Sequence, residues 1–401
     1  MVSIEDKYST YGRNLQASEI RRLFAISIKP GVISFAGGLP DPASFPSDEM
    51  ADVLDRLLRE RGSTLLQYGA SRGSQEGIQT VLKRMHRQGI NADESEIIVT
   101  NGAQQAIDLA ARVLTDPGDI ILTESPTFIG ALGIFRNARA SIIGVEIDEN
   151  GIIPDKLRAA IDNLNNKKIK FLYTIPAFHN PTGITLSPER RKEIYQIADD
   201  NDILILEDSP YGELWFDEDY ENMPTLKSLD TNGRVIYTGS FSKIISPGIR
   251  LGWAAADKQL IDRFDMAKQM LDVCPSPLIQ AAAAELSESG YLDEHINKLR
   301  NIYKLRCRAM LDALDEYMPD GVSWTHPKGG FYIWVTLPEN VDAMEMLNTA
   351  LANNVAYVIG SAFYPDGSGK NRLRVSFSNE SEEVINEGIK RLGITVRQTL
   401  Q

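Results

Sequence analysis

The sequence predicts an α/β protein with a large, mostly parallel sheet, followed by a smaller α+β region. Between about residue 95 and residue 255, short β-branched runs alternate with helical patterns, as in a parallel sheet. From residue 291 the pattern changes to one long amphipathic helix, followed by further strands and helices. The chain has 401 residues with 43% hydrophobic and 24% charged content, which excludes a disordered, collagen-like or disulfide-framed protein.

Four runs in the first region predict strands that end in a turn or a polar loop. They are SEIIVTNGAQQAIDLAARVL (95–114), IKFLYTIPAFHNPTG (169–183), ILILEDSPYGELW (203–215) and RVIYTGSFSKIISPGIRLGW (234–253). The second and third runs are joined by a helical pattern that begins after Ser187, with Pro188 in its first turn and Ile194, Ile197 and Ala198 facing inward. These three segments predict a βαβ unit.

The long helix predicted from residue 291 carries one apolar stripe. Its members are Leu292, Ile296, Leu299, Tyr303, Cys307, Met310 and Leu314. Because Cys307 lies on this stripe, we expect a core residue and not a reactive thiol. Strands are then expected in FYIWVTLP (331–338), AYVIG (356–360) and LRVSFS (373–378), with helices in 342–354 and 382–392. We therefore predict an N-terminal segment (1–45) that returns to the smaller domain, a large domain (46–290) and a small α+β domain (291–401).

The composition of the chain disfavours several classes of binding partner. Lys and Arg total 42 against 55 Asp and Glu, so the net charge of −13 disfavours nucleic acid and anionic membranes as partners. The only cysteines, Cys274 and Cys307, form no CxxC motif and no Cys/His cluster, so we expect no metal site and no disulfide, as in a reducing cytoplasm. The polar start lacks an apolar leader, and no apolar run reaches the roughly 18 residues of a membrane span.

Polar residues follow the predicted strands at their carboxyl ends, where open parallel sheets bind ligands. Gly102, Ala103 and Gln104 separate a strand from a helix, a place that favours an anion such as phosphate. Lys243 follows another strand in Ser-Phe-Ser-Lys, and Arg250 comes seven residues later. Taken alone, the Asn-Gly turn that contains Gly102 is an ordinary loop between a strand and a helix, and Lys243 is an ordinary solvated residue at the end of a strand.

Residues at the ends of the neighbouring strands add further polar and aromatic side chains to this predicted site. Asp208 ends a buried run, a costly position for a carboxylate unless it meets a positive partner. Asn180 and Tyr211 add neutral donors, and Phe128 offers a flat apolar face. A phosphate cradle, a nucleophilic amine, an acid for a heteroaromatic nitrogen and a ring to stack are together what pyridoxal 5′-phosphate (PLP) requires.

At this point the sequence resembles the fold-type I PLP-dependent aminotransferases of class I/II, over nearly the whole chain. The matching motifs are SFAGGLPDP, LQYGASRGSQEG, TNGAQQAID, ESPTF, HNPTG, EDSPYGEL, SFSKIISPGIRLGW, PKGGFYIWV and LRVSFS. The opening NLQASEIRRLF, followed by SFAGGLPDPASFP, resembles the branch that holds 2-aminoadipate and kynurenine aminotransferases. The resemblance implies the PLP-transferase fold, with a seven-stranded, mostly parallel sheet in the large domain.

The resemblance also implies roles for individual residues. Lys243 would bond covalently to the cofactor and then move the substrate proton, while Asp208 would pair with the pyridine nitrogen. Asn180 and Tyr211 would donate to the phenolic oxygen, and Phe128 would stack on the ring. The phosphate would be held by Gly102, Ala103, Gln104, Ser240, Ser242 and Arg250, with Tyr68 reaching in from the second subunit of a homodimer.

For the substrate, Arg374 in LRVSFS matches the arginine that grips the α-carboxylate, and Gly38 matches a backbone contact to the same group. Ser18 and Arg21 lie in a segment similar to the short helix that covers the side-chain pocket. Two positions depart from the family pattern, because Phe128 stands where relatives commonly have Tyr and His179 where near relatives often have Gln. Both departures concern the pocket for the substrate side chain and the chemical properties of the bound cofactor.

The predicted function is transamination in two half-reactions, from an L-amino acid (2-aminoadipate, aromatic or large aliphatic) to a 2-oxo acid, 2-oxoglutarate. PLP-dependent lyases, cyclases and oxidases share the scaffold and remain alternatives. A non-catalytic sensor resembling the aminotransferase-like domain of PLP-responsive transcription regulators is a third alternative. Those regulators carry a basic winged-helix domain, whereas only about 30 residues precede SFAGG in this acidic chain.

Overall fold

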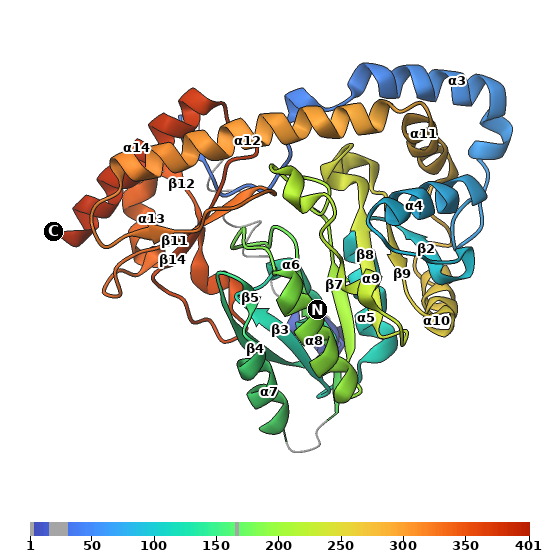
Figure 1. The fold of residues 1–401 in the computed structure, drawn as a ribbon, viewed down its shortest axis with the longest axis horizontal. Helices are drawn as coiled ribbons and strands as arrows, with labels where there is room; N and C mark the ends of the chain where they lie inside the picture. The colour runs from blue at the N-terminus through green and yellow to red at the C-terminus, as the bar shows by residue number, and fades with distance from the viewer. Residues whose placement is uncertain (1–3, 16–30, 165–167) are drawn as a thin grey trace.

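The protein, seen in a computed structural model, is built around one large sheet; the structure describes residues 4–15, 31–164 and 168–401 (Figure 1). From edge to edge the strands are β2 (Ile97–Thr100), β9 (Gly252–Ala255), β8 (Val235–Ser240), β7 (Leu204–Asp208), β6 (Ile169–Thr174), β3 (Ile120–Ser125), β4 (Ser141–Asp148) and β5 (Gly151–Ile152). The strands from β8 through β4 pair in parallel. The α/β class and the mostly parallel sheet are thus confirmed.

The sheet departs from the sequence prediction in two places. At one edge, β5 folds back antiparallel on β4 through a tight turn that ends at Gly151, whose φ of +93° favours glycine. This two-residue strand makes the sheet eight-stranded. Near the other edge, β9 lies antiparallel between β8 and β2, where the sequence predicted only a polar loop. Four residues are too few for a periodic signal to separate such a strand from a loop.

Alternate residues of the central strands point to opposite faces of the sheet, and each face has its own helices. Phe171 and Tyr173 of β6 belong to one core cluster, and Leu172 between them belongs to another. The first face is covered by α5 (Ala103–Leu114), α6 (Ile129–Asn137) and α10 (Lys258–Gln269). The second face is covered by α7 (Pro154–Asp162), α8 (Pro188–Asp200) and α9 (Leu226–Leu229).

The predicted βαβ unit is confirmed in β6, α8 and β7. The Ser187 hydroxyl caps α8 by accepting from the Arg190 backbone N–H at 3.3 Å, and Pro188 occupies the first turn. Ile194 and Ile197 are buried against the second face of the sheet, as their spacing predicts. The helix therefore fixes β6 and β7 as parallel neighbours.

The long C-terminal helix is also confirmed, as α12 (Tyr291–Tyr317). Every predicted member of its stripe is buried, and Cys307 is 3% exposed with its thiol pKa raised to about 12 by burial. In Figure 1, α12 runs along one side of the molecule, from α11 (Pro277–Glu288) near one end to α14 (Glu382–Leu400) near the other. Two further helices, α3 (Ser47–Leu65) and α4 (Gln75–Arg87), pack against α11.

Beyond α12, a second sheet forms from β10 (Ser323–Trp324), β11 (Tyr332–Thr336), β14 (Arg372–Ser376) and β13 (Val358–Ile359), next to α13 (Ala343–Ala352). The predicted strand in AYVIG is instead two short pieces, because Tyr357 separates β12 (Val355–Ala356) from β13. β12 pairs in parallel with β1 (Ile33–Ser34), so the N-terminal segment lies beside this region. The domain limits at residues 45 and 290 stay a prediction.

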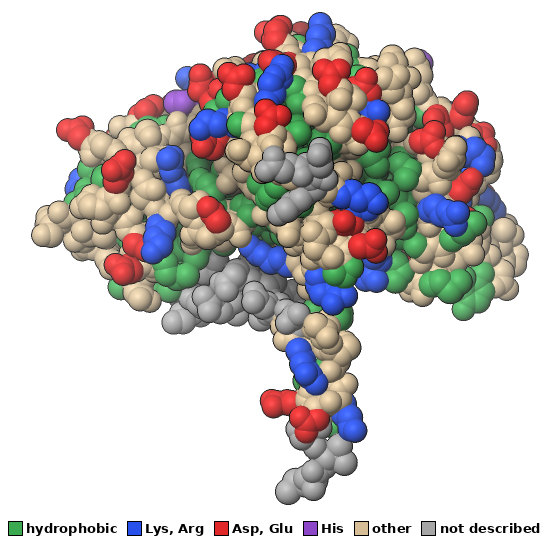
Figure 2. Space-filling model, turned by 90° about the horizontal axis from the view of Figure 1, so that it is seen from below, with side chains coloured by type: hydrophobic (Ala, Val, Ile, Leu, Met, Phe, Trp, Pro, Cys, Tyr) green, Lys and Arg blue, Asp and Glu red, His purple; other side chains and the backbone are tan. Residues whose placement is uncertain are grey.

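The first described residues stand apart from the body. Residues 4–13, which include most of α1 (Thr10–Asn14), are exposed almost throughout, and Figure 2 shows this segment projecting from a face on which acidic and basic side chains are interspersed. Within the described ranges, no helix combines the length and apolarity needed to cross a membrane. The same ranges hold no group of three or more His, Cys, Asp or Glu arranged for a metal ion.

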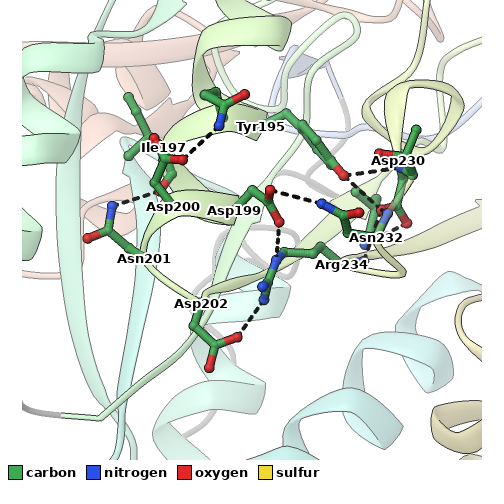
Figure 3. A network of polar contacts seen from close by, with 12 residues as sticks. Tyr195, Ile197, Asp199, Asp200, Asn201, Asp202, Asp230, Asn232 and Arg234 are labelled. Carbon is green, nitrogen blue, oxygen red and sulfur yellow. Dashed lines mark hydrogen bonds and ion pairs between the residues drawn. The ribbon is translucent and has the colours of Figure 1, made fainter.

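A polar network holds the amino-terminal ends of β7 and β8, at the end of the sheet opposite to the predicted site (Figure 3). The Arg234 guanidinium pairs with Asp199 at 2.5 Å and with Asp202 at 2.7 Å. The Asp230 carboxylate accepts from the backbone N–H groups of Arg234 and Val235 at 3.0 Å, and from the Lys227 ammonium at 2.9 Å. The side chain of Asp230 is fully buried.

The negative charge of Asp230 therefore stabilises this end of the sheet. Burial alone would raise the pKa of Asp230, but Lys227 and the two backbone donors hold that pKa below the ordinary value of 3.8. The stabilisation is complete above the ordinary pKa of an aspartate and is lost as the pH falls through the lowered one.

Replacing Asp230 by Asn should lower the free energy of unfolding by about 3 kcal/mol, because the buried Lys227 ammonium loses its partner. Urea unfolding at neutral pH measures the change. Asp202→Asn is the matched control: its side chain is 93% exposed, its ion pair is worth less than about 1 kcal/mol, and Asn accepts its φ of +54°. Equal losses for the two variants would contradict the prediction.

Candidate active site

A pocket of about 250 Å³ lies at the carboxyl ends of the parallel strands. Its lining comes from the segment after β1, from α5, from the loops after β3, β6, β7 and β8, and from the second sheet. The lining residues are Gly38, Leu39, Ala103, Gln104, Ile107, Phe128, Ile175, Asn180, Asp208, Pro210, Tyr211, Ser240, Ser242, Lys243, Pro247, Arg250, Tyr332 and Arg374. The strand ends predicted to share one site therefore do share a pocket.

Most of the predicted site residues line this pocket, and Gly102 lies next to it, against the Arg250 guanidinium. Tyr68 does not line it: within one chain its side chain is 78% exposed. Ser18 and Arg21 lie outside the described residues.

The predicted phosphate cradle is the start of α5. Gly102 precedes the helix with φ +85°, and no side chain caps the first turn. Arg250, in the left-handed conformation with φ +50°, crosses to this turn and donates to the backbone oxygen of Asn101 at 3.0 Å. The start of a twelve-residue helix and a nearby guanidinium together favour a dianion.

Two serines extend the cradle from the loop after β8. The Ser240 hydroxyl donates to the Ser242 hydroxyl at 2.9 Å and accepts from the Ser242 backbone N–H at 3.0 Å. Both serines line the same pocket as Ala103 and Gln104 of α5.

Lys243 ends the short 3-10 helix Phe241–Lys243, which follows β8. Its amine donates to the backbone oxygen of Gly38 at 3.0 Å. Burial, together with the guanidinium charges of Arg374 and Arg250, lowers the pKa of Lys243 to about 8. Near neutral pH the neutral amine that a nucleophile requires is therefore more abundant than it is for an exposed lysine.

Asp208, the last residue of β7, is 3% exposed. Its two carboxylate oxygens accept from the hydroxyls of Tyr173 and Thr238, both at 2.8 Å. The effect of burial outweighs that of the two hydroxyls, and the pKa of Asp208 is raised to about 6. A cation beside it would keep the carboxylate ionised at neutral pH.

Arg374 projects from β14, and its side chain is buried. One terminal nitrogen donates to the Asn180 side-chain oxygen and the other to the Ala36 backbone oxygen, both at 2.9 Å. Its Nε has no hydrogen-bond partner among the described residues. The guanidinium is thus held in place with donors to spare, as a carboxylate ligand requires.

Tyr332 is the main lining residue that the sequence analysis missed. Its hydroxyl lies 3.0 Å from the Tyr211 hydroxyl, and its ring lies 4.2 Å from the Arg374 guanidinium carbon. The motif PKGGFYIWV contains it, but a tyrosine in a strand is an ordinary core residue until its neighbours are known. Only the pairing of β11 with β14 brings it into the pocket.

The two departures from the family pattern lie in different places. Phe128 lines the pocket. His179 is buried outside the lining, with its Nδ1 at 2.7 Å from the Thr182 hydroxyl and its Nε2 at 3.0 Å from a Glu124 carboxylate oxygen. It therefore supports the loop that carries Asn180.

These residues fit PLP. A cradle for a dianion, an amine with a lowered pKa, and a buried carboxylate that has no cationic partner among the described residues face one pocket. The spare donors of Arg374 fit the carboxylate of an amino acid beside the cofactor.

Comparisons with known proteins agree with this geometry. The family model described as Aminotransferase class I and II matches residues 32–392. Aromatic-amino-acid aminotransferase 1 of Thermococcus litoralis is 41% identical over 400 residues, covering 99% of this chain and 95% of the relative.

Two solved structures share the fold. The kynurenine aminotransferase of Pyrococcus horikoshii, in complex with PMP, KYN and KYA, has a TM-score of 0.95 and 40% identity, covering 100% of this chain and 99% of that one. The α-aminoadipate aminotransferase of Thermus thermophilus, complexed with N-(5′-phosphopyridoxyl)-L-leucine, has a TM-score of 0.91 and 35% identity, with the same coverage.

Replacing Gly102 by Ala should weaken PLP binding to the apoprotein by at least about tenfold. A Cβ at this position would lie 2.6 Å from an Arg250 terminal nitrogen and would push the guanidinium away from the start of α5. Titration of the apoprotein with PLP, followed by absorbance, measures the affinity. Gly118→Ala is the control, because its φ of +91° gives similar strain while nothing lies within 4 Å of the added Cβ. Unchanged affinity in Gly102→Ala would refute this role for the turn.

Proposed function

Because this chain belongs to the class I and II aminotransferases and is a PLP-dependent transaminase, we propose that it transfers amino groups from aromatic amino acids and 2-aminoadipate to 2-oxoglutarate. Large aliphatic amino acids are further proposed donors. The proposal rests mainly on one observation: the Lys243 amine and the Arg374 guanidinium line the same pocket. One group serves the reacting carbon, and the other serves the α-carboxylate that all these substrates share.

When bound, PLP supplies an electrophilic carbon that bonds to amines and a conjugated ring that accepts electrons from the substrate. Lys243 is the proposed anchor and proton carrier, since its lowered pKa lets its amine accept a proton near neutral pH. The Asp208 carboxylate is proposed to hold a proton on the ring nitrogen. Tyr173 and Thr238 fix its orientation through their hydroxyls.

Arg374 is proposed to bind the α-carboxylate of both the donor and the acceptor. Its bond to Asn180 leaves the Asn180 NH₂ group available as a donor toward the cofactor. Gly38 is proposed to add a backbone contact, and the same residue now accepts from the Lys243 amine. Side-chain selection by Ser18 and Arg21 stays a prediction from the sequence.

An assay of purified protein with PLP tests this proposal. Each candidate amino acid is paired with 2-oxoglutarate, and the formation of glutamate is followed. Glutamate should form with phenylalanine, kynurenine and 2-aminoadipate. Consumption of the donor without glutamate, with release of ammonia, would instead identify a lyase or an oxidase.

Lys243→Ala should abolish the visible absorption band of the holoenzyme and reduce transamination by several orders of magnitude, because no other amine lines the described pocket. The control is Lys258→Ala on α10, because the Lys258 side chain is 60% exposed and does not line the pocket. Normal turnover by Lys243→Ala, measured in the same assay, would overturn the assigned role.

We also propose that two copies form a homodimer. Leu66, Tyr68, Met270 and Val273 are apolar side chains more than half exposed in a single chain. Their two segments meet where the Gly69 backbone N–H lies 3.4 Å from the Cys274 sulfur. Such an apolar surface favours a protein partner, and a second copy would also bring Tyr68 to the cradle of its neighbour.

Static light scattering should give twice the mass of 44.5 kDa, and mixed dimers should reveal shared sites. Chains with Lys243→Ala and chains with Tyr68→Ala should each be impaired alone. Co-expression should recover activity, because one site of a mixed dimer has both Lys243 and a Tyr68 from the other copy. A fully active monomer, or no recovery on mixing, would refute the shared site.

A cytoplasmic location is the remaining proposal. Both cysteines are free thiols, and Cys307 is buried in the apolar stripe of α12. Free thiols are typical of a reducing compartment.

A further inference from the structure

Tyr332 brings a second phenol to the hydroxyl of Tyr211. The two oxygens lie 3.0 Å apart, and both side chains are buried, at 2% and 3% exposure. The rings meet edge to face, with centroids 5.8 Å apart. The two hydroxyls therefore share one hydrogen bond on the wall of the pocket.

Packing leaves Tyr332 little freedom to turn away from Tyr211. Its ring lies against the Arg374 guanidinium on one side, with 4.2 Å between the guanidinium carbon and the ring centroid. The backbone of Gly38 passes so close to its hydroxyl that a Cβ at Gly38 would overlap the oxygen. The Tyr332 backbone in β11 pairs with Ser376 of β14, which fixes the position of the residue.

The direction of the shared hydrogen bond follows from the number of protons. Burial raises the pKa of Tyr211 well above its ordinary value of 10, so Tyr211 stays neutral with a single proton. If Tyr211 donates that proton to the cofactor, it has none left for Tyr332. Tyr332 must then be the donor, and Tyr211 the acceptor, of the bond between them.

We propose that Tyr332 is a positioning residue of the transamination site: by donating to Tyr211, it orients the Tyr211 hydroxyl and strengthens the hydrogen bond from Tyr211 to the phenolic oxygen of PLP. Chains of hydrogen bonds polarise one another, so a donor behind Tyr211 makes Tyr211 a better donor. This role depends on the proposed contact of Tyr211 with the cofactor.

The test is Tyr332→Phe, which removes the hydroxyl and keeps the ring on Arg374. A donor to the phenolic oxygen favours its anionic form, so a weaker donor makes the cofactor lose its proton at higher pH. The pH midpoint of the change in the visible band of the holoenzyme should rise by about half a unit, in keeping with one buried neutral hydrogen bond. KM for the amino acid should change less than about threefold, since Arg374 is undisturbed.

Tyr357→Phe is the matched control. The Tyr357 hydroxyl is also buried and donates to a backbone oxygen, that of Ala343, at 2.8 Å, but the residue lies outside the pocket lining. It loses a comparable hydrogen bond and should leave the midpoint unchanged. An equal shift in Tyr357→Phe would show that general loosening of the fold, and not Tyr332, moves the midpoint.

A double-mutant cycle with Tyr211→Phe decides whether the effect passes through Tyr211. In the Tyr211→Phe background, Tyr332→Phe should produce no further shift. No shift in the single variant, or the same shift in both backgrounds, would overturn the proposal. Wild-type protein that binds PLP and titrates in this way, yet transaminates no tested pair, would refute the proposed function and leave the role of Tyr332 standing.

Discussion

The buried guanidinium of Arg374 joins parts of the chain that are far apart in sequence. It is attached to β14 of the second sheet, donates to Asn180 in a loop of the large sheet, and donates to Ala36 in the N-terminal segment. A buried cation is stable only when its donors are satisfied or a carboxylate neutralises it. Its position therefore requires all three segments to be in place. The substrate end of the pocket depends on this convergence.

The charges in the pocket follow from the same packing. Lys243, Arg250 and Arg374 surround a small volume, and burial with mutual repulsion lowers the pKa of the lysine to about 8. On the ring side, burial raises the pKa of Asp208 to about 6. Both groups are shifted toward their neutral forms, so an anionic phosphate and a cationic ring nitrogen would each relieve a cost that the protein alone bears.

The parallel sheet explains why sequence patterns located so much of the site. Carboxyl ends of parallel strands share one edge, so the residues that end β6, β7 and β8 meet without any further information. Asn180, Asp208 and Lys243 were predicted on this ground, and all three line the pocket. Their chemical roles came from a family resemblance and remain to be tested by substitution.

The sequence by itself determined the α/β class, the βαβ unit around α8 and the buried stripe of α12, because periodicity and capping are local. It also identified the family, because motifs over nearly the whole chain resemble those of the class I/II aminotransferases. Only the tertiary structure decided that β9 inserts antiparallel and that Tyr332 meets Tyr211. Those contacts depend on strand pairing and side-chain direction across long sequence separations, and a local pattern does not contain either.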